Sequence, residues 1–229
     1  MLDPATQTRG PDNSSPARRS SSPAGAFEQP DLLLIERARG GSEQATEALL
    51  RRYGRRLFRV ARTVIVDDER AESVVREACV AAFSDLSRYE PTGKFAAWLT
   101  RLTYQHARAE RRTPWDPRGT PAETAQPQDP RELAAAVAQL PEVFRTVFVL
   151  RVIEGISGIE TAASLGVHET TVRTRLHRAL RRLDGELVRS IRLRPDLLDL
   201  PAGALQSLVN SVLAHLPRGP ATAGGAAAP

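Results

Sequence analysis

Apolar residues recur at helical spacing along most of this chain of 229 residues. They return every three or four positions, and no stretch alternates apolar and polar residues as a strand would. Between about 31 and 112 the pattern predicts four helices. The first is capped by Asp31 and ends at Gly40 and Gly41, and the second is capped by Ser42. The third covers about 68–86, and the fourth starts at about Lys94, after the loop "SRYEPTG". We therefore expect a first helical block.

The helices of this block carry clear apolar stripes, which predict its core. The second helix offers Leu49, Leu50, Tyr53, Leu57, Val60, Ala61 and Val64; the third Ala71, Val74, Val75, Ala78 and Ala82; and the fourth Trp98, Leu99 and Leu102. Such faces favour a small aliphatic bundle.

A second helical block is expected over about 129–190. Asp129 is placed as an N-cap, Pro130 takes the first helical position and Glu132 closes a capping box. The next helix starts at Pro141 and ends at Gly155, with core positions Val143, Phe144, Val147, Phe148 and Leu150. A short helix around Ile159–Leu165, a turn at Gly166 and an arginine-rich helix follow, and a last amphipathic helix starts at Leu205.

The stretch "GVHETTVRTRLHRALRR" has five arginines between Arg173 and Arg182 and no acid among them. A short helix, a glycine turn and a second helix describe a helix-turn-helix. Ala162 is small where the helices approach, and Leu165, Val167, Val172 and Leu176 fill the space between them. The exposed face then carries Thr170, Arg173, Thr174, His177 and Arg178, suited to base edges, with Arg181 and Arg182 suited to phosphates. A solvated basic face is the alternative, but the agreement of turn, small residue and charge favours DNA binding.

Composition narrows the function classes. The formal net charge is +5, and Lys94 is the only lysine among 32 basic residues, a bias that a high-GC genome also explains. A single cysteine, Cys79, excludes an internal disulfide and a multi-thiolate zinc site. Scattered histidines argue against a metal, and the chain has no phosphate-binding glycine loop or nucleophile motif. We expect no metal, no cofactor and no enzymatic activity. The first residues are unlike a signal peptide and no apolar run approaches the ~20 residues of a membrane span, so we expect a cytoplasmic protein.

Three segments are predicted to lack a packed structure. Residues 1–30 and 219–229 are rich in Pro, Ser, Gly and Ala and indicate disordered tails. The stretch from Thr113 to Pro130 holds five prolines and predicts a linker between the two blocks.

The segment "LPEVFRTVFVLRVIEGISGIETAASLGVHETTVRTRLHRALRRL" resembles the C-terminal DNA-binding domain of bacterial sigma factors of the extracytoplasmic-function group, group 4 of the sigma-70 superfamily. The matching motifs are Leu140-Pro141, Glu154-Gly155-Ile156-Ser157, Leu165-Gly166, and Thr171 through Ala179. "RRYGRRLFRVARTVIVDDERAESVVREACVAAF" followed by "KFAAWLTRL" resembles the other conserved domain of that family. Together the two similarities cover about 31–190.

The resemblance implies an all-α fold of two small domains. These are a four-helix sigma domain 2 over 31–112 and a helix-turn-helix sigma domain 4 over 129–190, joined by a proline-rich linker over 113–128 and followed by an extension over 191–229. It also implies a protein that is not an enzyme by itself. Such a protein docks on core RNA polymerase, through the clamp of the β′ subunit and the flap of the β subunit, gives it promoter specificity, and in some cases binds an anti-sigma factor.

The family's functional residues carry over to three sets of positions. The set expected to read the −35 element is Thr170, Thr171, Arg173, Thr174, His177, Arg178, Arg181 and Arg182. The set expected to capture and melt the −10 element is Arg88, Tyr89, Lys94, Phe95, Trp98 and Arg101, in line with the pairing of aromatic and basic residues that holds single strands. The set expected on the polymerase clamp is Glu72, Val75, Arg76, Glu77 and Val80. Core packing is the alternative role for Phe95 and Trp98, and it is favoured for Trp98.

The chain departs from the family pattern at several of these places. Arg70 and Ser73 stand where acids are usual on the clamp helix, and Arg76 replaces a glutamine. Tyr104-Gln105 replaces the usual Arg-Asn. The departures indicate a divergent member with its own promoter.

Two other functions stay open. A stand-alone helix-turn-helix regulator explains 140–182 but gives the first block no purpose, and a sigma-like cofactor would bridge polymerase and another factor. For the C-terminal helix, packing on the chain's own DNA-binding domain is favoured. The alternatives for that helix are a dock for polymerase or an anti-sigma protein, or a lid over a DNA-binding face.

Overall fold

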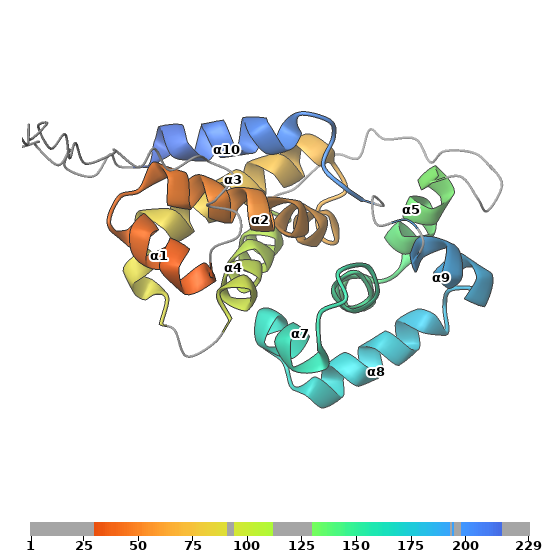
Figure 1. Cartoon of the computed structure of the whole chain (residues 1–229). Coiled ribbons are helices and arrows are strands. Elements are labelled where there is room, and N and C mark those ends of the chain that lie inside the picture. The colour runs from red at the N-terminus through yellow and green to blue at the C-terminus, as the bar shows by residue number, and fades with distance from the viewer. Residues whose placement is uncertain (1–29, 91–93, 112–129, 193, 195–197, 217–229) are drawn as a thin grey trace, which may run out of the picture.

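The computed structural model describes residues 30–90, 94–111, 130–192, 194 and 198–216, and every regular element in these ranges is a helix (Figure 1). The elements are α1 (Asp31–Arg39), α2 (Glu43–Arg62), α3 (Asp68–Ser84), η2 (Leu86–Arg88), α4 (Phe95–Glu110), α5 (Pro130–Gln139), α6 (Glu142–Phe148), η3 (Val149–Ile153), α7 (Gly158–Leu165), α8 (Glu169–Leu180), α9 (Gly185–Arg192) and α10 (Ala204–His215). The all-α prediction is confirmed. The expected linker 113–128 and nearly all of the expected tails lie outside the described residues.

The first group of helices, α1–α4, encloses one aliphatic core. All the stripe residues predicted for α2 and α3 are buried in it, and Leu99 of α4 is buried, whereas Trp98 and Leu102 are half-buried. Ser42 caps α2 as predicted, by accepting a hydrogen bond from the backbone N–H of Ala45. Local pattern and tertiary packing agree here, which is why the sequence alone located these helices.

The prediction that Asp31 caps α1 is wrong. Asp31 is the first helical residue, and Pro30 occupies the cap position. The Asp31 carboxylate instead accepts hydrogen bonds from Arg52 and from the Tyr53 hydroxyl of α2. Burial and this carboxylate raise the pKa of Tyr53. A partner on the neighbouring helix has thus replaced the local capping role.

The second group, α5–α9, has a core of its own around Leu133, Val137, Phe148 and Ile191. Pro130 begins α5 as predicted, whereas Asp129 and the Glu132 side chain lie outside the described residues. The inward position predicted for Val143 is wrong, since it is 38% exposed. The other predicted core positions hold: Val147, Phe148 and Leu150 are buried, and Phe144 is half-buried. The π-helix η3 continues α6, and Gly155 follows it with a φ of +64°.

The C-terminal helix α10 packs on the first group, along α2 and α3 (Figure 1). The packing of α10 on the DNA-binding domain, which the sequence favoured, is therefore wrong. In the second group, α5, α6, η3, α8 and α9 already bury one another's apolar faces. The first group, by contrast, takes Leu208, Val209 and Val212 of α10 into its core, all at most 5% exposed.

The two groups touch directly as well. Leu150 and Ile156 of the second group are buried in the core of the first, and α7 packs along α4. These contacts show a closed arrangement of the two groups.

Among the described residues, no helix combines the length and the apolar character needed to cross a membrane.

Candidate nucleic-acid interface

The pair α7–α8 has the local geometry of a helix-turn-helix. Ser157 caps α7 in a reciprocal capping box with Glu160, a signal that the sequence reading missed. Gly166 ends α7 in the left-handed region, with φ 65° and ψ 40°, which glycine adopts without the steric cost of a Cβ. The small core between the helices is Val147, Ala162 and Val172, with Leu165, Val167 and Leu176 against it. The predicted turn and contacts of this motif are both present.

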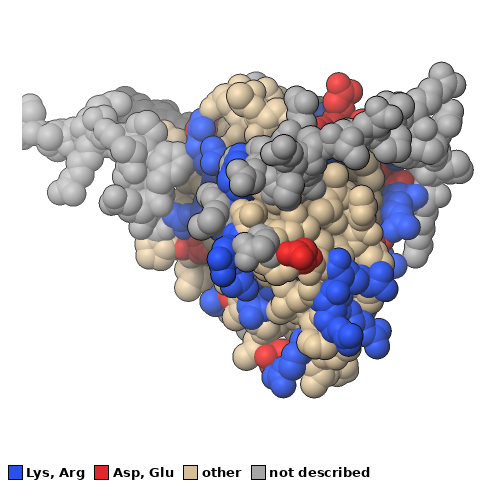
Figure 2. Space-filling view, turned by 90° about the vertical axis from the view of Figure 1, so that its right-hand side faces the viewer, with Lys and Arg blue, Asp and Glu red and all other residues tan. Residues whose placement is uncertain are grey.

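One face of α8 is open to solvent. Its exposed residues are Thr170, Arg173, Thr174, His177, Arg178, Arg181 and Arg182, and Thr171 is half-buried. Figure 2 looks at the right-hand side of Figure 1, where α8 ends, and shows a cluster of basic side chains at its lower right. The Thr174 hydroxyl donates to the Thr170 carbonyl at 3.0 Å, and Arg182 lies 5.5 Å above the ring of Phe144. The residues predicted to read the −35 element are thus brought together on one accessible surface.

The aromatic residues of the predicted −10 set form a packed cluster. The ring centroids of Tyr89 and Phe95 are 5.2 Å apart, and Trp98 lies 5.4 Å from Tyr89 and 5.5 Å from Phe95. Tyr89 and Phe95 are only 3% and 2% exposed, whereas Trp98 is half-buried and Arg88 is exposed. In this conformation only the edge of the cluster reaches the surface.

Lys94 and Arg101 of the −10 set contact the helix-turn-helix, although both remain exposed to solvent. Lys94 forms an ion pair with Glu160 of α7, and this contact lowers the pKa of the Glu160 carboxyl. The guanidinium of Arg101 lies over the turn, since a Cβ added to Gly166 would be 3.4 Å from its Nη2. Two cations of the expected −10 surface are therefore in contact with α7 or the turn that follows it, while the expected −35 surface is open.

The predicted clamp residues lie on α3 at different depths. Val75 is fully buried, Glu77 is exposed, and Glu72, Arg76 and Val80 are half-buried. Burial, together with the nearby acids of the first turn of α3, raises the pKa of the Glu72 carboxyl. Four of the five predicted positions thus offer side chains to a partner, and Val75 does not.

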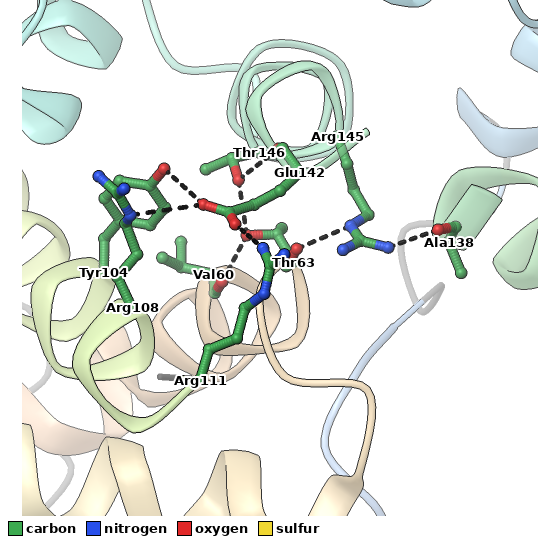
Figure 3. Close-up of polar contacts among 9 residues, drawn as sticks. All are labelled: Val60, Thr63, Tyr104, Arg108, Arg111, Ala138, Glu142, Arg145 and Thr146. Atoms are coloured by element: carbon green, nitrogen blue, oxygen red, sulfur yellow. Dashed lines mark hydrogen bonds and ion pairs between the residues drawn. The ribbon is translucent and has the colours of Figure 1, made fainter. Parts of the chain in front are cut away.

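Polar contacts between α6 and the first group form a network that no pattern in the sequence predicts (Figure 3). The Glu142 carboxylate accepts hydrogen bonds from the Tyr104 hydroxyl, at 3.0 Å, and from Arg111. Burial and this carboxylate raise the pKa of Tyr104 to about 12. The Thr63 and Thr146 hydroxyls are 2.8 Å apart.

Two further residues complete the contact between the groups. Arg145 donates to the Thr63 carbonyl at 2.7 Å. Glu154, whose side chain is 7% exposed, pairs with both Arg56 and Arg59 of α2. No local pattern marks these residues, because their partners lie some 80 to 100 positions away.

Comparisons with known proteins agree with this geometry. Residues 49–115 match the family profile Sigma-70 region 2, and residues 131–183 match the profile Sigma-70, region 4. The ECF RNA polymerase sigma factor SigE of Mycolicibacterium smegmatis is 34% identical over 153 residues, 60% of this chain and 59% of that protein. SigD of Mycobacterium tuberculosis, also an ECF RNA polymerase sigma factor, is 33% identical over 134 residues, 52% of this chain and 63% of that protein. The chain thus spans less than two thirds of the length of these two relatives.

The architecture also resembles a solved structure, that of CnrH in complex with the cytosolic domain of CnrY. The TM-score is 0.54 at 28% sequence identity, and the match covers 66% of this chain and 93% of CnrH.

Proposed function

The chain belongs to the sigma-70 family, with relatives in its extracytoplasmic-function group, and on that basis we propose that it binds core RNA polymerase and directs promoter-specific transcription initiation. In this proposal α7 and α8 read the −35 element, the N-terminal half of α4 captures the −10 element, and α3 holds the polymerase clamp. We place these steps in the cytoplasm. The protein adds specificity and no catalytic group.

The open face of α8 is the observation that carries the proposal. It presents arginines and threonines directly after a left-handed glycine turn, and no acid interrupts the arginines. Arginine offers a planar fork of donors that fits guanine edges and phosphates, and hydroxyls accept or donate at either base type. The region 2 match ahead of it on the same chain favours a sigma factor over a stand-alone regulator.

The −10 function requires the closed arrangement to open. Lys94 and Arg101 are exposed, but Lys94 pairs with Glu160 and the Arg101 guanidinium lies against the turn at Gly166, so we propose that a strand replaces these contacts when α7 leaves α4. We propose that these two cations and the edge of Trp98 hold the unstacked strand. Tyr89 and Phe95 support Trp98 from beneath and meet a base only if the aromatic cluster itself opens.

The proposed partners follow from the same assignment. Glu72, Arg76, Glu77 and Val80 would contact the β′ clamp, with Val75 supporting them from the core, and the second group would contact the β flap. The similar protein CnrH forms a complex with the cytosolic domain of CnrY. We extend this to the proposal that an anti-sigma protein binds the closed form of this chain.

Run-off transcription tests the function. Core polymerase is assayed with and without the protein on genomic fragments upstream of transcript starts that appear after overexpression. We expect discrete products only when the protein is present, and their loss in an Arg173→Ala, Arg178→Ala double variant. Arg189→Ala, on the neighbouring helix α9, is the matched arginine control. DNA binding without initiation would favour the stand-alone regulator, and polymerase binding without initiation would favour the bridging cofactor.

A further inference from the structure

Helix α2 provides much of the surface on which α10 packs. Leu208, Val209 and Val212 of α10 are buried in the same core as the stripe of α2. At the edge of this apolar centre, Arg51 of α2 donates a hydrogen bond to Gln206. The contact between α2 and α10 therefore combines a buried apolar centre with a peripheral hydrogen bond.

Gly54 provides the closest approach. A Cβ added to this glycine would lie 2.7 Å from a methyl carbon of Leu205 and 3.5 Å from one of Leu208. Among the described residues, no other atom outside its own helix and chain neighbours comes within 4 Å. Glycine in the middle of a helix is destabilising relative to alanine. Of the described elements, only α10 comes close enough to explain the place of Gly54 in α2.

The segment before α10 couples this packing surface to the second group. Asp199 pairs with Arg55 at 3.6 Å and with Arg59 at 3.4 Å, and Arg59 also pairs with Glu154 of the second group. Arg59 is only 12% exposed. One guanidinium therefore serves both the docked extension and the closed second group, so that each contact favours the other.

Chain length makes the extension the tighter of two tethers. Residues 193–203 join α9 to α10 and can span at most about 40 Å when fully extended. Residues 111–129 join α4 to α5 and can span about 70 Å. While α10 stays docked, the extension rather than the linker limits how far the second group can move from the first.

We propose that the α2–α3 face around Gly54 is a helix-docking site whose occupant in the free protein is α10, and that docked α10 is a clasp holding the two DNA-binding groups closed. Release of α10 frees α7 to leave α4, which separates Lys94 from Glu160 and Arg101 from the turn at Gly166. The consequence for transcription rests on the proposed sigma function. The docking of α10 and the closure of the two groups are independent of that function.

Fluorescence resonance energy transfer between two dyes, one on each group of helices, measures how closed the protein is. Exposed alanines, changed as Ala81→Cys on α3 and Ala135→Cys on α5, take the dyes. Native Cys79 is fully buried, and burial raises the pKa of its thiol to about 12, so it stays unlabelled. Energy transfer is compared among the full chain, a chain ending at Leu198, Gly54→Leu, and both changes together. Ala214→Leu, on the exposed side of α10, is the matched control.

We expect lower energy transfer in the truncated chain and in Gly54→Leu, no further loss in the combination, and no change in Ala214→Leu. Because the Cβ introduced at position 54 points at Leu205 and Leu208 of α10, we expect Gly54→Leu to have no further effect on energy transfer once α10 is absent. At limiting protein, both variants should give roughly five- to tenfold more run-off product, the size of an ordinary coupling between sites.

Two outcomes overturn the clasp. One is unchanged energy transfer in both variants. The other is a loss of helical structure in the truncated chain, measured by circular dichroism. That loss would mean that α10 is a structural part of the first group. Reduced transfer combined with no run-off from any chain, the unchanged one included, supports the clasp and contradicts the sigma function instead.

Discussion

The arginines of α8 differ in the kind of DNA contact their positions allow. Arg173 and Arg178 stand on the exposed face with Thr170 and Thr174, whereas Arg181 lies at the C-terminal end of the helix. We predict that Arg173→Ala costs about 1–3 kcal/mol of binding and relaxes specificity at one promoter position, because a bidentate base contact is lost. A binding panel of single-base promoter variants measures this.

Arg181→Ala serves as the matched comparison. It should weaken all sequences alike and lower the slope of log affinity against log salt by about one, as expected when one phosphate contact is removed. An equal loss on every promoter variant with Arg173→Ala would contradict its base-reading role.

Gly166 is the residue on which the angle of the helix-turn-helix depends. Its φ of +65° is unfavourable for a residue with a Cβ, and the guanidinium of Arg101 already lies at contact distance. We predict that Gly166→Ala destabilises the protein by about 1–2 kcal/mol, measured by urea unfolding. Gly185→Ala is the control, since nothing lies within 4 Å of its added Cβ. A similar loss in both variants would show that the strain at Gly166 is not the cause.

At the scale of elements, α3 shows that burial decides which residues can test a surface. Val75 is fully buried, so a charge placed there would unfold the first group rather than probe its partner. We predict that Arg76→Glu with Glu77→Lys abolishes co-purification with core polymerase while circular dichroism stays unchanged. Glu69→Lys, near the start of the same helix, should not. Undiminished co-purification of the folded double variant would remove this surface from the proposal.

The sequence predicted elements well where local and tertiary preferences coincide. The stripes of α2 and α3, the Ser42 cap and the Gly166 turn all follow from residues within a few positions of one another. Asp31 and Val143 were misplaced because neighbouring helices decided their environment. Helix α9 was not predicted at all. Its eight residues do carry a clear apolar face, which packs against α5 and η3, but a stretch this short is easily overlooked in a search for helical periodicity.

At the scale of the whole molecule, the sequence located the residues of the candidate site. It did not predict which of them would contact the other group of helices. An apolar stripe shows that a helix is buried without showing against what, so the pattern of α10 fitted the second group as well as the first. The ion pairs of Glu142 and Glu154 likewise depend on partners far along the chain. Which of the two expected DNA surfaces is open therefore came from the structure alone.

The pairing of Glu154 with two arginines gives the closed arrangement its most buried charge contact, and it can be tested apart from α10. Glu154→Gln removes one of the carboxylates that pair with the nearly buried Arg59, a change that is strongly unfavourable when no relaxation is possible. Here relaxation is possible, because the second group can move away and let water reach Arg59. We predict that Glu154→Gln lowers energy transfer between the dyes while the unfolding midpoint changes little. Glu36→Gln, which removes an exposed ion pair within α1, should change neither, since such pairs contribute about 0–1 kcal/mol. A lower unfolding midpoint at unchanged energy transfer would mean that Glu154 stabilises the fold itself, and that the two groups separate by some other route.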